Sequence, residues 1–372
     1  MLELPDPDRL PDAPHPRDAM QVFGHTAAVE DVLQSLNSGK FHHAWMVTGP
    51  EGIGKATLAY KAAAAILAKP ADEGGGFFGD APAALEQLDL PYDHPINQRI
   101  RAGSEPGLFV LRRGPNKDGN KLSQVITVDE VRKLRNFFSM SAGGNGKRVV
   151  IVDSVDELNT QAANALLKML EEPPAGAIMF LITHRPGAVL PTIRSRCRVL
   201  PLSPLPTEDM QAAYAQAMQG QAFEAGLQVL AQGSVGTAIN LSAQGGLDVY
   251  TALIDVFSKA PSLDRGAVMR LAEQSSARGN EGGMDRFAAM LDMFLSRLAR
   301  SSVLADDIQV CSGERELFAR LNPALQTARI WANLQQQAGA ALREGIAVNL
   351  DPVAMILDTA FKFEDTASRT LR

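Results

Sequence analysis

The segment Gly49-Pro50-Glu51-Gly52-Ile53-Gly54-Lys55-Ala56-Thr57 constrains the fold of this chain more than any other. It has the glycine and lysine spacing of a phosphate-binding P-loop, in which backbone N–H groups and the lysine hold phosphates. The complete motif continues with a Ser or Thr that binds Mg²⁺, but this chain has Ala56 at that position. The pattern therefore predicts the architecture of an ATP site that lacks one group needed for turnover.

The sequence on both sides of this loop fits a P-loop. The apolar residues 44–48 predict a buried parallel strand, and the alanine-rich run after Thr57 predicts a helix that ends at Pro70. A strand, a glycine loop and a helix N-terminus in this order form an anion site, although the same order also fits a tight turn without a ligand. The predicted residues of the degenerate nucleotide site are Gly49, Gly52, Gly54, Lys55, Thr57 and, from a later strand, Asp153.

Further strands and helices alternate up to about residue 204. Buried strands are predicted at 108–111, 148–153 and 178–183, and helices begin near Thr127 and at Gln161. This alternation predicts the α/β class, with a parallel sheet covered on both faces. Beyond Pro206 the pattern is helical, and Asp351-Pro352 predicts the start of the last helix.

Composition limits the compartment and the partners. Net charge is −6, which argues against a protein that binds nucleic acid on its own. No stretch resembles a membrane span or a signal peptide, and the two cysteines, Cys197 and Cys311, fit a reducing compartment. We therefore expect a cytoplasmic protein without membrane contact.

Several motifs occur together in a characteristic order. They are Phe23-Gly24-His25, His42-His43-Ala44, the P-loop, residues 164–168 with 170–174, and Ser195-Arg196-Cys197. In this order they resemble the clamp-loader family of AAA+ proteins, and specifically its delta-prime branch in the bacterial DNA polymerase III holoenzyme. The resemblance implies that Arg196 is an arginine finger, which reaches in trans into the ATP site of a neighbouring subunit. The alternative for Arg196 is a surface ion pair.

The chain departs from the hydrolysing members of that family at three positions. Ala56 replaces the metal ligand, Ser154 follows Asp153 where the catalytic Glu is usual, and Gly236 stands where an arginine senses the γ-phosphate. The loss of all three implies a stator subunit with very weak hydrolysis or none. These substitutions do not decide whether the chain is an enzyme by itself. They also do not decide whether its P-loop holds ATP.

The resemblance also implies the domains and the partners. The first 16 residues contain five prolines and several aspartates, and this composition predicts a flexible tail (1–19). The regions that follow are expected to be an AAA+ P-loop α/β domain (20–204), a helical lid (205–243) and a helical collar for oligomerisation (244–372). The implied partners are the gamma/tau and delta subunits and, through the complex, the sliding clamp and primer-template DNA. Direct DNA contact at Asn159 and Thr160 is one interpretation, and simple helix capping is the other.

Metal binding is not expected. Many delta-prime members carry a four-cysteine zinc module after the P-loop helix, but the insertion at 70–107 contains no cysteine. We therefore predict no zinc and no required cofactor.

Two other functions remain as alternatives. The first is an active AAA+ ATPase that recruits Thr57 to the metal and uses Asp156 or Glu157 as the base. The second is a module that binds ATP without cleaving it.

Overall fold

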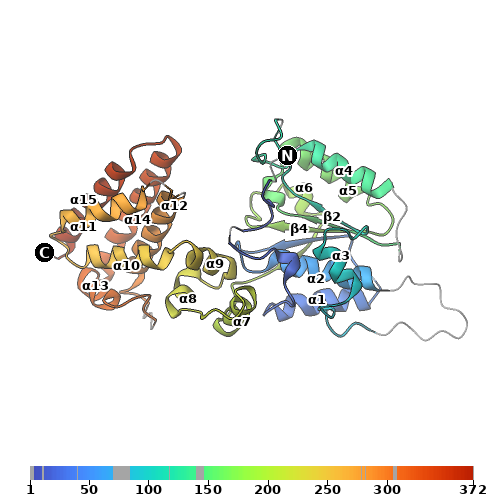
Figure 1. The fold of residues 1–372 in the computed structure, drawn as a ribbon, viewed down its shortest axis with the longest axis horizontal. Helices are drawn as coiled ribbons and strands as arrows, with labels where there is room; N and C mark the ends of the chain where they lie inside the picture. The colour runs from blue at the N-terminus through green and yellow to red at the C-terminus, as the bar shows by residue number, and fades with distance from the viewer. Residues whose placement is uncertain are drawn as a thin grey trace, which may run out of the picture. The chain divides into compact units, whose positions relative to one another are not determined.

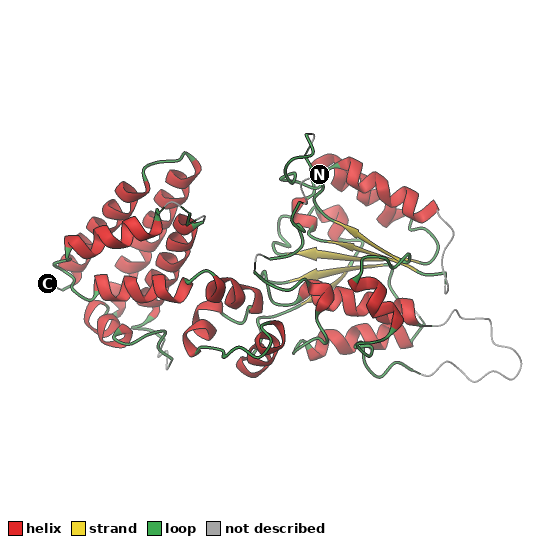
Figure 2. Cartoon of the chain, viewed as in Figure 1, coloured by secondary structure: helices red, strands yellow, loops and turns green. Residues whose placement is uncertain are grey.

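The computed structural model describes residues 4–10, 12–39, 41–69, 84–116, 118–139, 146–277, 279–280, 282–304 and 308–371. The chain divides into two compact units. The first contains Met1–Ala222 with Gln232–Ile239, and the second contains Phe223–Ala231 with Asn240–Arg372. In the part of the chain that the structure describes, all strands belong to the first unit (Figures 1 and 2).

The first unit is built on a five-stranded parallel sheet in the order β2-β3-β4-β1-β5. The strands are β1 (Ala44–Thr48), β2 (Leu108–Leu111), β3 (Arg148–Val152), β4 (Ala177–Thr183) and β5 (Arg198–Pro201). Every residue of β1, β3 and β4 is buried, as expected of central strands covered on both faces. The predicted α/β class and its parallel sheet are thus confirmed.

Helices cover both faces of this sheet (Figure 1). One face carries α1 (Thr26–Asn37), α2 (Lys55–Ala68) and α3 (Pro95–Arg101), and the other carries α4 (Val128–Ser139), α5 (Thr160–Glu171) and α6 (Pro191–Arg194). Separate apolar cores form on the two faces, because alternate residues of each strand point to opposite sides. Trp45 and Phe180 belong to one core, and Met46 and Leu181 to the other.

The carboxyl ends of the parallel strands meet at one edge of the sheet. The P-loop follows β1, Asp153 follows β3, and Thr183 ends β4. Because β3, β4 and β1 are neighbours in the sheet, these segments are brought together although they lie far apart in the sequence.

The N-terminal residues correct one prediction. Residues 1–19 were expected to form a flexible tail, but the described part of this stretch packs within the first unit and includes the short 3₁₀ helix η1 (Pro16–Asp18). Ala13 and His15 are buried, and the side chain of Asp8 is 1% exposed. Buried polar contacts fix the segment, despite the composition that suggested disorder.

Part of the insertion at 70–107 is helical. Residues 70–83 lie outside the described residues, whereas 84–107 contain α3. The helix begins with Pro95 at its first turn, and the His94 side chain accepts a hydrogen bond from the Ile96 N–H. A short helix with a histidine cap gives little periodicity, which explains why the sequence did not reveal it.

Residues 205–243, predicted as a lid, divide between the units. Helix α7 (Thr207–Ala217) belongs to the first unit, α8 (Ala225–Ala231) belongs to the second, and α9 (Val235–Ala243) begins in the first. Ser234 and Gly236 therefore belong to the same unit as the P-loop.

The second unit is helical. Its main helices are α10 (Gly246–Phe257), α11 (Arg265–Ser275), α12 (Gly283–Arg300), α13 (Glu314–Leu321), α14 (Leu325–Ala347) and α15 (Pro352–Thr370). Phe294, Trp331 and Phe363 lie in its core, and Asp351 caps α15 by accepting a hydrogen bond from the Ala354 N–H at 2.9 Å. Among the described helices, none combines the length and the apolar character needed to cross a bilayer.

Candidate functional site: a degenerate P-loop cavity

The glycines of the P-loop are required by its backbone. Gly52 and Gly54 have φ angles of 73° and 103°, in the left-handed region that favours glycine. At Gly49 a Cβ atom would lie 2.5 Å from the Leu202 carbonyl oxygen, which is closer than real contacts allow. The spacing seen in the sequence therefore marks a real P-loop, which runs from the end of β1 to the start of α2.

Each carbonyl from Gly49 to Ile53 accepts a hydrogen bond. The Lys55 ammonium donates to the Gly49 oxygen at 2.8 Å and also to the Pro50 oxygen. The other three bonds come from outside the loop: Ser234 Oγ to Glu51 (2.8 Å), Gly236 N–H to Gly52 (3.0 Å) and His25 Nε2 to Ile53 (2.7 Å). The loop is therefore fixed by its own lysine and by two distant segments.

Lys55 is buried, with an exposed fraction of 3%. Burial lowers the pKa of its ammonium to about 8, although the charges of Asp153, Glu51 and Asp156 oppose this shift. In a working P-loop the lysine contacts the β- and γ-phosphates. Here its ammonium bonds to the loop's own carbonyls.

We expect Lys55 to titrate near pH 8 in the isolated chain, well below the ordinary lysine pKa of about 10.4. Its charged form is disfavoured by desolvation and favoured by the Asp153 carboxylate, so Asp153→Asn should lower the midpoint further. The ¹³Cε shift of Lys55, followed by NMR from neutral to alkaline pH, measures the midpoint. A Lys55 midpoint near the ordinary lysine value of about 10.4 would contradict this description.

The carboxylates near the end of β3 have different surroundings. Burial, with an addition from the charge of Asp8, raises the pKa of Asp153 to about 7 despite the opposing charge of Lys55. The next residue, Ser154, is buried and is not a base. Asp156 accepts hydrogen bonds from Thr183 Oγ1 and the His184 N–H, both at 2.6 Å, and Glu157 pairs with Arg113 at 3.2 Å. Both candidate bases of the active-ATPase alternative are thus held by neighbouring residues.

A cavity of about 630 Å³ opens beside the P-loop within the first unit. The predicted site residues that line it are Gly52, Gly54, Lys55, Thr57 and Asp153, and the three departures, Ala56, Ser154 and Gly236, line it as well. Gly49 is outside this lining and packs against Leu202. The structure therefore gathers the predicted nucleotide residues and the substituted positions around one cavity.

Gly236 directly contacts the P-loop. A Cβ atom at this position would lie 2.9 Å from Gly52 Cα and 2.4 Å from Leu10 Cδ1. A larger residue would need a rearrangement of the loop and of the N-terminal segment, so the glycine is a packing requirement of this site.

Arg196 lies outside the cavity lining, as a residue acting on another subunit would. It follows α6, and its guanidinium pairs with Glu171 at 2.7 Å and donates to the Thr192 carbonyl at 2.9 Å. The pair is at the surface, with side-chain exposures of 36% for Arg196 and 42% for Glu171. The structure thus contains the ion pair that was the alternative interpretation. Because such surface pairs contribute only about 0–1 kcal/mol, the guanidinium can exchange Glu171 for another anion at little cost.

The start of α5 shows local capping. Asn159 Oδ1 accepts a hydrogen bond from the Ala162 N–H at 2.8 Å, which confirms the capping interpretation. Direct contact between this helix start and DNA stays a prediction.

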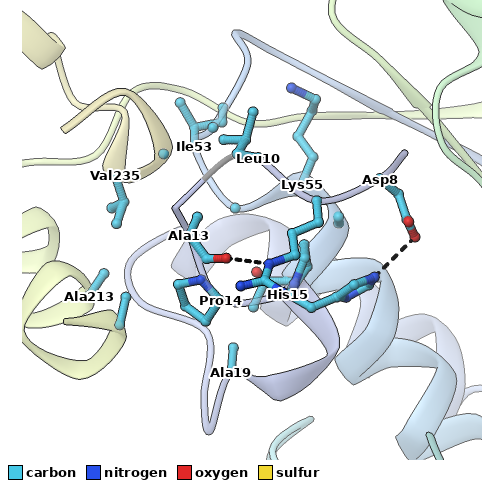
Figure 3. Close-up of a pocket in the computed structure, with 18 of the residues that line it drawn as sticks. Asp8, Leu10, Ala13, Pro14, His15, Ala19, Ile53, Lys55, Ala213 and Val235 are labelled. Carbon is cyan, nitrogen blue, oxygen red and sulfur yellow. Dashed lines mark hydrogen bonds and ion pairs between the residues drawn. The ribbon is translucent and has the colours of Figure 1, made fainter. Parts of the chain in front are cut away.

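The N-terminal segment contributes to the site, although no sequence pattern predicted that it would. Asp8, Leu10, Ala13 and His15 line the cavity together with the P-loop (Figure 3). Asp8 pairs with Arg112, 104 positions along the chain. No local sequence pattern predicts an ion pair between residues so far apart, and the prolines of the segment suggested disorder.

Among the residues that the structure describes, no three or more His, Cys, Asp or Glu side chains come close enough to hold a metal ion.

The sequence of this chain is similar to those of DNA polymerase III subunits. Residues 24–206 match the family model described as "DNA polymerase III, delta subunit". The delta-prime subunit of DNA polymerase III from Pseudomonas aeruginosa is 37% identical over 207 residues, which cover 55% of this chain and 56% of that protein. The Escherichia coli delta-prime subunit is 33% identical over 179 residues, 48% of each chain.

More distant similarity extends to another subunit type. The gamma/tau subunit of DNA polymerase III from Mycobacterium tuberculosis strain H37Rv is 29% identical over 207 residues, which cover 54% of this chain and 31% of that protein. This chain spans about half the length of the curated delta-prime relatives it matches.

Proposed function

Through residues 24–206 this chain belongs to the DNA polymerase III delta-prime family of clamp-loader AAA+ proteins, and we propose that it works as a clamp-loader stator. In this role it occupies a position in the subunit ring without appreciable ATP hydrolysis of its own. It helps the assembly to load the sliding clamp onto primed DNA.

One observation carries the proposal: the substituted positions line the same cavity as the P-loop. Ala56 offers no oxygen to Mg²⁺, Ser154 offers no base, and Gly236 offers no cation to a γ-phosphate. Asp156 and Glu157, which an active enzyme would need as substitutes, are bonded to β4 and to Arg113. These contacts argue against the active-ATPase alternative.

The second part of the proposal concerns Arg196. We propose that it leaves Glu171 on assembly and enters the ATP site of an adjacent gamma/tau subunit. An arginine supplied in trans stabilises the charge of the phosphoryl-transfer transition state. The surface position of Arg196 and its separation from the chain's own cavity both support this role.

The proposed partners follow from the family. They are the gamma/tau and delta subunits and, through the complex, the sliding clamp and primer-template DNA, all in the cytoplasm. The helical second unit is the proposed ring-forming collar, and α7 with the Ser234–Gly236 segment is the proposed part of the lid that stays with the P-loop. No cofactor is required for these roles.

The isolated chain provides the first test. We expect its steady-state ATP hydrolysis to equal that of the Lys55→Ala variant, because neither protein can position Mg²⁺ and an attacking water. Phosphate release is measured with and without primed DNA, and a reconstituted complex with gamma/tau and delta is the positive control. Substantial hydrolysis that disappears in Lys55→Ala would instead support the active ATPase.

A further inference from the structure

The N-terminal segment follows one wall of the P-loop cavity. Residues 6–10 and 12–15, here called the N-terminal strap, contribute Asp8, Leu10, Ala13 and His15 to the lining. Figure 3 shows these side chains together with Ile53 and Lys55 of the P-loop. The strap and the P-loop belong to the same compact unit.

A buried carboxylate anchors the strap. Asp8 is 1% exposed at its side chain, pairs with the Arg112 guanidinium, accepts a hydrogen bond from the Tyr60 hydroxyl at 3.3 Å, and lies 3.3 Å from His15 Nε2. Burial alone would raise the pKa of Asp8, but the neighbouring His15 and the charge of Arg112 outweigh it and lower the pKa to about 2. The strap is thus held by a charged contact that is costly to break.

Leu10 fills the space beside the P-loop. The distance of 2.4 Å from its Cδ1 atom to a Cβ built on Gly236 shows that the side chain lies directly over this glycine. Gly236 in turn donates its N–H to the Gly52 carbonyl. The strap therefore packs on the contact between the P-loop and the start of α9.

The charges around the cavity oppose a polyphosphate. The carboxylates of Glu51, Asp153 and Glu157 line it, and the strap adds Asp8. The cations on its wall are already engaged: Lys55 by two P-loop carbonyls, Arg113 by Glu157, and Arg9 by the Ala13 carbonyl at 2.6 Å. An entering triphosphate would meet these carboxylates and would have to displace existing bonds to reach a cation.

We propose that the N-terminal strap is an intramolecular occupant that excludes nucleoside triphosphates from this chain's own P-loop. Leu10 occupies space beside the loop, and Asp8 fixes the strap and adds a repelling charge. The strap thus makes one wall of the open cavity unfavourable for ATP, through a blocking side chain and a negative charge. This inference is independent of the role of Arg196, so either one can fail alone.

The test is equilibrium binding of a fluorescent N-methylanthraniloyl-ATP, with Mg²⁺, to the full chain. We expect the double variant Asp8→Asn/Leu10→Ala to bind about tenfold more tightly than the wild type, or better, because it loses a repelling charge and a blocking side chain. Adding Lys55→Ala to the double variant should remove the gain. Asp12→Asn is the matched control, since Asp12 is an exposed acid of the strap outside the cavity lining.

Two results would overturn the strap proposal. One is saturable binding by the wild type that is as tight as that of the double variant. The other is a double variant that keeps its circular dichroism spectrum and melting transition but gains no affinity. If the loss of the Asp8 charge prevents folding, Leu10→Ala alone decides the question, because Leu10 is only partly buried and the anchoring contacts remain.

Discussion

Replacing Arg196 by alanine is expected to depress ATP hydrolysis by the reconstituted clamp loader. At the site that Arg196 enters, the rate should fall by on the order of 10³ to 10⁵, the usual effect of an arginine finger supplied in trans. The variant should still assemble, because the ion pair it loses within its own chain is exposed and contributes little. DNA-stimulated phosphate release by the complex measures the first effect, and size-exclusion chromatography measures the second.

Arg194→Ala is the matched control for this experiment. Arg194 lies two residues away in α6 and is exposed, so it has the same charge in the same neighbourhood. We expect this variant to hydrolyse ATP at nearly the wild-type rate. Equal losses in Arg194→Ala and Arg196→Ala would point to a general surface effect, and unchanged hydrolysis in Arg196→Ala would remove the finger role.

The second large effect concerns the stability of the helical unit. Glu314, at the start of α13, is 1% exposed and bonds to Arg297 Nε at 2.9 Å, to the Tyr250 hydroxyl at 2.5 Å and to the Val310 N–H at 2.7 Å. Its carboxylate thereby connects α10, α12 and the segment before α13. Glu314→Ala should lower the free energy of unfolding of this unit by about 3–5 kcal/mol, because it removes the anion from a buried, charged network.

Tryptophan fluorescence can isolate this effect. Trp331 is buried in the helical unit and Trp45 in the α/β unit, so in a Trp45→Phe background the signal during urea unfolding reports on the helical unit alone. Glu316→Ala is the matched control, since Glu316 lies in the same first turn of α13 but is exposed. It should change stability by less than about 0.5 kcal/mol. Equal stabilities for the two variants would refute a structural role for the network.

The sequence predicted those parts of the α/β unit that depend on local patterns. The P-loop was recognisable because its backbone needs glycine at Gly52 and Gly54, and the central strands because each contains an uninterrupted apolar run of four residues or more. Strand β5 was missed because it is a short edge strand with three of its four residues exposed. An edge strand of this kind lacks the apolar run that identifies β1.

The part of the site that was missed depends on long-range contacts. Asp8 forms an ion pair with Arg112, and the Glu51 carbonyl accepts a hydrogen bond from Ser234 Oγ. No sequence periodicity links positions that are so far apart in the chain. The sequence did indicate which chemical groups the site lacks: the metal ligand, the catalytic base and the arginine that senses the γ-phosphate. It did not indicate that the N-terminal strap lines the P-loop cavity or that Arg196 pairs with Glu171.

The most direct test of the whole account is a paired measurement of ATP hydrolysis by the reconstituted complex carrying either Lys55→Ala or Arg196→Ala in this chain. The account predicts a rate within about twofold of wild type for Lys55→Ala, because this chain's own P-loop does no chemistry, and a pronounced loss for Arg196→Ala. The reverse pattern, with the loss caused by Lys55→Ala and not by Arg196→Ala, would contradict it.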